Sequence, residues 1–171
     1  MMDNEIKNPI PTNIITGFLV VGKTTAIQKL IAKKPQKERW AVLVNDFGDV
    51  GIDSNLFEGG TEDQNGVTVS QVPGGCMCCA NGLPIQMALS ILLAKSKPQR
   101  LLIEPTGLGH PKEVISMLSR NYYQEILELR ATVSLVDARK IKDRRFTANE
   151  TFNQQLDVAE IIIANKADLY G

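Results

Sequence analysis

Two short stretches, far apart in the chain, carry residue types that together would bind a nucleotide. Residues 17–24 read Gly-Phe-Leu-Val-Val-Gly-Lys-Thr, which fits the phosphate-binding pattern G-x-x-x-x-G-K-[ST]. In that pattern the glycines let backbone amides face the phosphates, and the helix that follows directs its N-terminus at the same anion. Lys23 would reach the terminal phosphates, and the Thr24 hydroxyl would bind Mg²⁺. The residues predicted to bind nucleotide here are Gly17, Gly22, Lys23, Thr24 and Thr25.

Valine at positions 20 and 21 is unusual inside such a loop. A β-branched residue tolerates a positive φ angle poorly. If either Val20 or Val21 needs that backbone conformation, we expect the phosphate loop to be strained.

The second stretch is Asn165-Lys166-Ala167-Asp168, which directly follows an apolar run. This is the position at which a GTPase reads its base. Asp168 would accept hydrogen bonds from the ring N–H and the exocyclic amine of guanine, which adenine cannot supply, so the wrong base would leave a polar group unpaired. Lys166 would cover the ring with its apolar stem, and Asn165 would tie this loop to the phosphate loop. The order of the two stretches predicts GTP or GDP as the ligand.

Three acidic side chains are candidates for the chemistry of hydrolysis. Glu104 ends the apolar run 101–103, and an acid at the carboxyl end of a parallel strand lies at the ligand edge of the sheet. We expect Glu104 to hold Mg²⁺ or its water, with the Gly107 amide meeting the γ-phosphate. Asp46 and Asp49 follow another apolar run, and they would complete the magnesium shell, orient the attacking water or bind a second metal. The predicted catalytic set is Lys23, Asp46, Asp49 and Glu104.

All three cysteines of the chain lie in one segment, Cys76-Met77-Cys78-Cys79. Thiolates are soft donors that favour Zn²⁺, Cu(I) or Co²⁺ over Mg²⁺ or Ca²⁺. The set has no second pair of cysteines, which suits a site that releases its metal. The candidates for a fourth ligand are Asp46, Asp49 and His110. Of these, His110 fits a cap or packing role before Pro111 better than a ligand role. A strained disulfide is the rival interpretation. We predict zinc binding by Cys76, Cys78 and Cys79.

The bulk composition fits a single domain. The chain has 171 residues, 43% hydrophobic and 22% charged, with 19 basic and 19 acidic side chains. This length allows one buried core, and the balanced charge gives no reason to expect nucleic acid or acidic lipid as a partner. No apolar run is long enough to span a membrane, and tightly clustered cysteines suit a reducing compartment. We therefore expect a cytoplasmic protein with no nucleic-acid or membrane partner.

The elements that must position these residues alternate along the chain between apolar runs and helical patterns. Strands are expected at 13–15, 41–44, 67–72, 101–103, 133–136 and 161–163, and helices at 24–33, from Pro84 onward and from Pro111 onward. Strands that alternate with helices imply a parallel sheet with helices on both faces. The predicted fold class is α/β: a P-loop NTPase with a mostly parallel central sheet, in one domain over residues 1–171.

Five segments together resemble the CobW-type metallochaperone GTPases, a group that includes the UreG and HypB nickel-insertion proteins. These segments are 17–25, 45–53, 74–79, 103–107 and 165–169. The stretches 74–84 and 104–111 look most like the YeiR-type zinc-binding branch of the family. The resemblance implies slow GTP hydrolysis coupled to holding a transition metal and handing it to a recipient metalloprotein. The metal is expected to be zinc, with Co²⁺ or Ni²⁺ as alternatives.

The same resemblance implies a C-terminal domain beyond residue 171, so we expect the chain to be a truncated GTPase domain. Whether the protein forms a homodimer stays open. The chain departs from the family at Val20 and Val21, where glycine and a small residue are usual. It also departs at Asp46 and Asp49, which replace the usual glutamates.

Two other functions fit part of the pattern. A P-loop kinase or ATPase with incidental cysteines would keep the phosphate loop, but Asn165 and Asp168 argue against it. A non-catalytic binding module would use the nucleotide only to stabilise an interaction surface. Preference for ATP over GTP would favour the first, and the absence of phosphate release at saturating GTP would favour the second.

Overall fold

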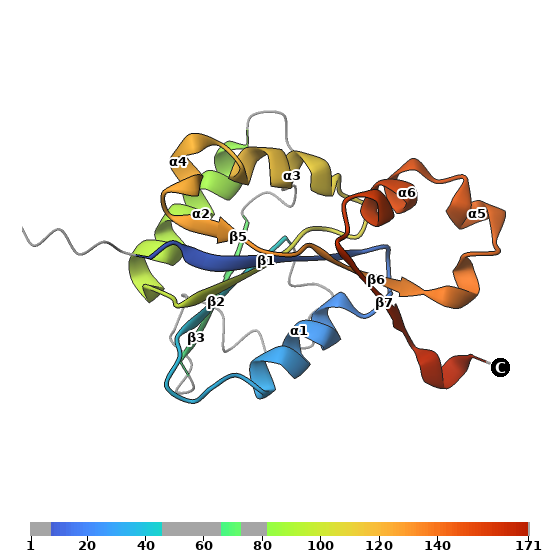
Figure 1. Ribbon diagram of the computed structural model, residues 1–171, viewed down its shortest axis with the longest axis horizontal. Helices are drawn as coiled ribbons and strands as arrows, with labels where there is room; N and C mark the ends of the chain where they lie inside the picture. The colour runs from blue at the N-terminus through green and yellow to red at the C-terminus, as the bar shows by residue number, and fades with distance from the viewer. Residues whose placement is uncertain (1–7, 46–65, 73–81, 171) are drawn as a thin grey trace, which may run out of the picture.

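The computed structural model describes residues 8–45, 66–72 and 82–170, and Figure 1 shows how their elements are arranged. The strands of this part of the chain are β1 (Ile10–Gly17), β2 (Trp40–Val44), β3 (Val67–Gln71), β4 (Arg100–Glu104), β5 (Leu127–Leu129), β6 (Val133–Asp137) and β7 (Ile161–Asn165). The α-helices are α1 (Lys23–Ala32), α2 (Leu83–Ser96), α3 (Pro111–Leu118), α4 (Asn121–Gln124), α5 (Arg144–Thr147) and α6 (Glu150–Asp157). Two short 3-10 helices are η2 (Ala138–Lys140) and η3 (Ala167–Leu169).

The strands form one sheet with the order β3-β2-β4-β1-β6-β7, and β5 pairs with the first residues of β1. Every pairing is parallel. β1 lies at the centre, with Ile14 opposite Ile103 of β4 and Gly17 opposite Leu135 of β6. Because parallel strands point the same way, the loops after β1, β4, β6 and β7 meet at one edge of the sheet. The predicted parallel sheet and each predicted strand are confirmed.

Successive residues of the central strands point into two different buried layers. On β1, Ile14 belongs to the core cluster that includes side chains of α2 and α3, whereas Ile15 belongs to the cluster that includes Ile27 of α1. Figure 1 shows α1 on one face of the sheet and α2 and α3 on the other. The prediction of helices on both faces is therefore confirmed. Each fully buried Leu or Ile side chain in these two layers contributes roughly 1.5–3 kcal/mol to folding.

Three of the described helices begin where the sequence expects them, and three others (α4, α5 and α6) are not predicted. α1, α2 and α3 match the predicted positions within one residue, and Pro84 and Pro111 both lie in the first turn of their helices. The sequence pattern does not predict α6. Its signal is Asn149, whose side-chain oxygen accepts a hydrogen bond from the Phe152 N–H at 3.0 Å and caps the helix. None of the described helices is long and apolar enough to cross a membrane.

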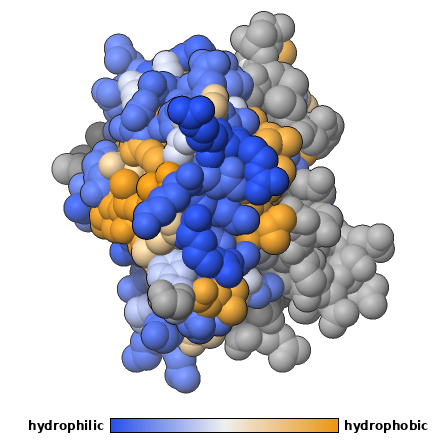
Figure 2. Space-filling view, turned by 90° about the vertical axis from the view of Figure 1, so that its right-hand side faces the viewer, coloured by the Kyte–Doolittle hydropathy of each residue, from blue (hydrophilic) through white to orange (hydrophobic). Residues whose placement is uncertain are grey.

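β7 is covered far less than the other strands of the sheet. Ile161, Ile162 and Ile163 are 47%, 57% and 45% exposed, although strands of a parallel sheet are normally buried on both faces. Among the described residues β7 pairs with β6 alone. Figure 2 looks at the end of the molecule where β6, β7 and α5 lie, and shows apolar patches among hydrophilic ones there.

Candidate nucleotide-binding site

The phosphate loop runs from the end of β1 to the first residue of α1. Gly17 has a φ of +144° and Gly22 a φ of +96°, which L side chains rarely adopt. A Cβ on Gly17 would lie 2.5 Å from the Leu135 carbonyl oxygen, and a Cβ on Gly22 would lie 2.6 Å from Asn165 Nδ2. Both glycines are therefore required by their neighbours on β6 and β7 as well as by the turn itself.

Thr24 and Glu104 bring the phosphate loop and the end of β4 together. The Thr24 hydroxyl donates to the Glu104 carboxylate, 3.0 Å from Oε1 and 3.3 Å from Oε2. Glu104 is only 8% exposed, so its charge is held away from water beside the first turn of α1. Both side chains offer oxygen atoms, which are the ligands that Mg²⁺ prefers. The two residues predicted to hold magnesium therefore fit that ion.

Lys23 and Gly107 lie close to each other. Lys23 is largely buried, and its Nζ donates to the Phe18 carbonyl at 3.4 Å, across the phosphate loop. A Cβ on Gly107 would lie 3.0 Å from Lys23 Nζ and 3.1 Å from the Leu19 backbone nitrogen. The loop after β4 therefore packs directly against the phosphate loop, and a side chain at Gly107 would fit only if its neighbours shifted by a few tenths of an ångström.

A cavity of about 330 Å³ opens between these loops. Its lining residues are Val20, Gly22, Lys23, Thr24, Thr25, Glu104 and Lys166. Two lysines and the N-terminus of α1 make much of this lining positive, which suits phosphate groups. Most of the residues predicted to bind nucleotide thus face one cavity.

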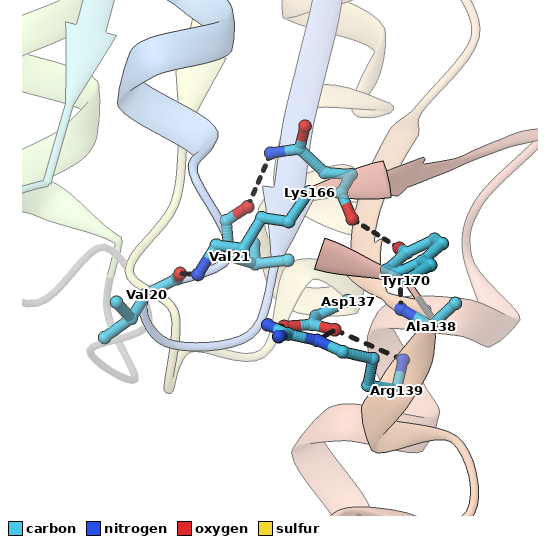
Figure 3. A network of polar contacts seen from close by, with 8 residues as sticks. Val20, Val21, Asp137, Ala138, Arg139, Lys166 and Tyr170 are labelled. Carbon is cyan, nitrogen blue, oxygen red and sulfur yellow. Dashed lines mark hydrogen bonds and ion pairs between the residues drawn. The ribbon is translucent and has the colours of Figure 1, made fainter. Parts of the chain in front are cut away.

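The base-reading loop is tied to the phosphate loop by two hydrogen bonds, which Figure 3 shows from close by. Asn165 Nδ2 donates to the Val21 carbonyl at 2.8 Å, and Lys166 Nζ donates to the Val20 carbonyl at 2.7 Å. The predicted link from Asn165 to the phosphate loop is confirmed. Asp168 follows in η3 and is exposed, so its carboxylate is open to a ligand.

Val20 carries the strain that the sequence suggests. Its φ is +57°, in the left-handed region, and its side chain is 81% exposed. A left-handed conformation costs a residue with a Cβ roughly 1–2 kcal/mol. Val21 behaves differently, because it is not among the residues with positive φ and it is buried in the core cluster beneath α1. The strain therefore belongs to one valine and not to both.

Tyr170 supports the base-reading loop, although no sequence motif includes it. Its hydroxyl donates to the Asn165 carbonyl and accepts from the Ala138 N–H at 2.9 Å. This side chain therefore joins the end of β7 to the end of β6 (Figure 3). The sequence shows only that Tyr170 lies two residues after Asp168. That spacing does not predict the hydrogen bond with Ala138.

Asp137 and Arg139 form an ion pair beneath the same loop (Figure 3). Arg139 Nη2 lies 2.6 Å from Asp137 Oδ2, and Arg139 Nε donates to Asp137 Oδ1 at 2.9 Å. These hydrogen bonds lower the pKa of Asp137 to about 2. The carboxylate also accepts from the Arg139 backbone N–H and caps η2. Its charge is thus already paired within the turn, so it is not a candidate base.

Five predicted site residues lie outside the part of the chain that the structure describes: Asp46, Asp49, Cys76, Cys78 and Cys79. His110 is described and occupies the N-cap position of α3, where its side chain makes no capping hydrogen bond. Among residues 8–45, 66–72 and 82–170, no group of three or more His, Cys, Asp or Glu side chains is placed to hold a metal ion.

Comparison with known proteins places this geometry in a family. The model of the CobW/HypB/UreG nucleotide-binding domain matches residues 11–171. The zinc chaperone YeiR of Escherichia coli is 52% identical over 157 residues, covering 92% of this chain and 46% of that protein. The zinc-regulated GTPase metalloprotein activator 1 of Schizosaccharomyces pombe is 30% identical over 174 residues, covering 95% of this chain and 40% of that protein.

Solved structures agree with these matches. The crystal structure of Zn(II)-bound YjiA GTPase from Escherichia coli superposes with a TM-score of 0.65 at 25% identity, covering 94% of this chain and 52% of that chain. The present chain thus spans about half the length of the relatives it matches. From its motifs, its sheet and these likenesses, the chain belongs to the CobW/HypB/UreG family and contains the nucleotide-binding domain of that family.

Proposed function

We propose that the protein binds and hydrolyses GTP and uses the nucleotide to control a transition metal that it delivers to a recipient metalloprotein. The observation that carries the GTP part is that two segments contact the phosphate loop and the start of α1. Glu104 at the end of β4 contacts Thr24, and Asn165 and Lys166 of the base-reading loop donate to carbonyls of the phosphate loop. Phosphate-binding and base-reading residues are thereby set side by side at one edge of the sheet.

Each residue of the site has a separate task in this proposal. Lys23 neutralises the terminal phosphates, and Thr24 with Glu104 holds Mg²⁺, which when bound supplies a positive charge against the β- and γ-phosphates. The Gly107 amide meets the γ-phosphate. Asp168 accepts from the guanine edge, and Lys166 covers the ring. Asp46 and Asp49 belong to the proposed catalytic set with Lys23 and Glu104.

The metal is the cargo of the protein. We assign it to the thiolates of Cys76, Cys78 and Cys79, and we expect zinc because two relatives are zinc chaperones by name and a third is a Zn(II)-bound GTPase. Soft thiolates also accept Co²⁺. Such thiols keep their metal-binding form in a reducing compartment, so we place the protein in the cytoplasm.

The guanine assignment is tested by the substitution Asp168→Asn. Xanthine carries a carbonyl where guanine carries its exocyclic amine, so an asparagine amide would pair with xanthine and reject guanine. We expect affinity for GTP to fall on the order of 100-fold and affinity for xanthosine triphosphate to rise, in a competition assay against a fluorescent nucleotide. Asp157→Asn, an exposed change on α6, is the control. Tighter binding of ATP than of GTP by the wild type would sink the assignment.

The coupling of nucleotide to metal needs its own experiment. Cobalt titration in the presence of Mg-GTP or Mg-GDP reports thiolate ligation through its charge-transfer absorption. We expect affinity for Co²⁺ to differ between the two nucleotide states and the band to vanish in Cys78→Ser. If nucleotide changes the affinity for metal, metal must change the affinity for nucleotide by the same factor. Equal metal affinity in the GTP and GDP states would therefore contradict control of the metal by the nucleotide.

A further inference from the structure

The inference starts from Gln155, a polar side chain that lies in the interior. Gln155 belongs to α6 and is only 1% exposed. Its Nε2 donates to the Gly107 carbonyl oxygen at 3.0 Å, across 48 residues of sequence. Gly107 is itself buried against the phosphate loop. A side chain of α6 therefore holds the backbone of the loop that follows β4.

Packing alone does not explain an amide at this position. The Oε1 atom of Gln155 is buried and has no hydrogen-bond partner among the described residues. An unpaired buried oxygen destabilises a fold, and an apolar side chain of equal length would avoid that cost. The orientation is nevertheless fixed, because turning the amide over would set two carbonyl oxygens against each other. What the amide supplies is the hydrogen bond to Gly107.

The other hydrogen bonds within the turn that Gln155 holds are local ones. The Thr106 carbonyl accepts from the Gly109 N–H at 2.9 Å, and the Thr106 hydroxyl accepts from the Leu108 N–H at 3.4 Å. Both bonds lie within the turn, so they do not join it to another element, against which it is otherwise placed by its packing on the phosphate loop. The bond from Gln155 ties the turn to another element and so sets where the Gly107 backbone lies beside Lys23 and Leu19.

α6 contacts the phosphate loop as well. Phe152 lies one turn before Gln155, and its ring meets the Phe18 ring edge to face with centroids 5.9 Å apart. Phe18 is the second residue of the phosphate loop. One short helix thus touches the two loops that border the place of the γ-phosphate, one through an aromatic contact and the other through a hydrogen bond.

We propose that Gln155 is a positioning residue that couples the γ-phosphate site to α6. By holding the Gly107 carbonyl it fixes the peptide group that follows Gly107 and so the position of the Gly107 Cα, next to the N–H that we assign to the γ-phosphate. A shift of that loop between GTP and GDP is transmitted to α6. This inference rests on the proposed GTP site and adds to it the element that senses the nucleotide state.

The test compares Gln155→Met with Gln154→Met. Methionine keeps the length of glutamine but cannot donate to Gly107. Gln154 is the neighbouring residue on α6, and its Oε1 is also buried without a partner; its substitution repeats the chemical change without touching Gly107. We expect Gln155→Met to weaken binding of a non-hydrolysable Mg-GTP analogue about tenfold and to change GDP affinity less than twofold. Gln154→Met should leave the ratio of the two affinities at its wild-type value.

The outcomes separate the two proposals. A wild-type ratio in Gln155→Met, or equal weakening of both nucleotides, would overturn the role of Gln155, since a purely structural residue affects GTP and GDP alike. A wild-type protein that binds no guanine nucleotide would instead overturn the proposed function. If Gln155→Met does not fold, the coupling is tested in the wild-type protein by NMR spectroscopy. The side-chain NH₂ resonance of Gln155 should move when the analogue replaces GDP while that of Gln154 stays, and an unmoved resonance would contradict the coupling.

Discussion

At the scale of single residues, the site combines strain with close packing in the phosphate loop. Val20 keeps a left-handed backbone although it is β-branched, and its carbonyl is held by Lys166. Residues in such conformations persist only where their surroundings over-determine them. Here the surroundings are the base-reading loop. The strain of the Val20 backbone therefore offsets part of the stabilisation that the hydrogen bonds between the two loops provide.

This balance predicts that Val20→Gly stabilises the protein. Glycine adopts a φ of +57° without strain, and the exposed valine side chain loses little burial. After the greater freedom of glycine in the unfolded chain is subtracted, we expect a gain of about 1 kcal/mol in the free energy of unfolding, measured by urea denaturation. Val21→Gly is the matched control and should lose roughly 1.5–3 kcal/mol, because Val21 is buried. Destabilisation by Val20→Gly would mean that the loop is not strained.

At the scale of elements, the sequence predicts the sheet and the large helices because their apolar runs are long and regular. The runs at 41–44 and 101–103 become β2 and β4, which are wholly or almost wholly buried. α4, β5 and α5 escape prediction because they are three or four residues long, shorter than any reliable period. α6 is not predicted because its helical pattern is largely polar. Its cap, Asn149, is a residue type that also occurs in turns, so it does not by itself indicate a helix.

The same division holds for the candidate site. Motif residues such as Lys23, Thr24 and Asn165 are found from spacing, because the two sequence patterns that contain them can be recognised before any tertiary contact is known. Tyr170 and Gln155 are not found, since each acts on a residue brought near only by tertiary packing, Ala138 in one case and Gly107 in the other. A single sequence gives no register between distant elements, so such links are invisible in it.

Tyr170 joins two elements, and its removal tests that link. In Tyr170→Phe the Ala138 N–H and the Asn165 carbonyl both lose their partner. We expect a loss of about 1–2 kcal/mol in the free energy of unfolding, together with weaker discrimination between GTP and ATP in nucleotide competition. Tyr122→Phe removes the same hydroxyl from a tyrosine that is 64% exposed, so its stability should change by less than about 0.5 kcal/mol. Equal effects of both changes would argue against the link.

At the scale of the whole molecule, the described residues cover β3 and β2 at one end of the sheet far better than β7 at the other. β2 is fully buried, whereas the three isoleucines of β7 are about half exposed. An exposed apolar strand at the edge of a sheet is a template for pairing with another chain. The face seen in Figure 2 is therefore where we expect this chain to associate with itself.

That expectation is measured by sedimentation velocity over a range of protein concentrations. Ile162→Lys places a charge on β7 and should shift the protein toward the monomer. Ile141→Lys is the control, because Ile141 is 52% exposed, close to the 57% of Ile162, but follows η2 and belongs to no strand. A concentration-independent monomer in the wild type, or an equal shift in both variants, would show that the β7 edge does not drive association.

The close approach of Gly22 to Asn165 has a consequence for how the molecule folds. The hydrogen bond from Asn165 to Val21 spans 144 residues, so the turn after β1 acquires this part of its support only when β7 has joined the sheet. Contacts of such large sequence separation form late, because closing a long loop costs entropy before the contact is gained. During synthesis the phosphate loop leaves the ribosome long before its partner. We therefore expect nucleotide to bind only after the sheet has closed, because the pocket includes Lys166, which directly follows β7.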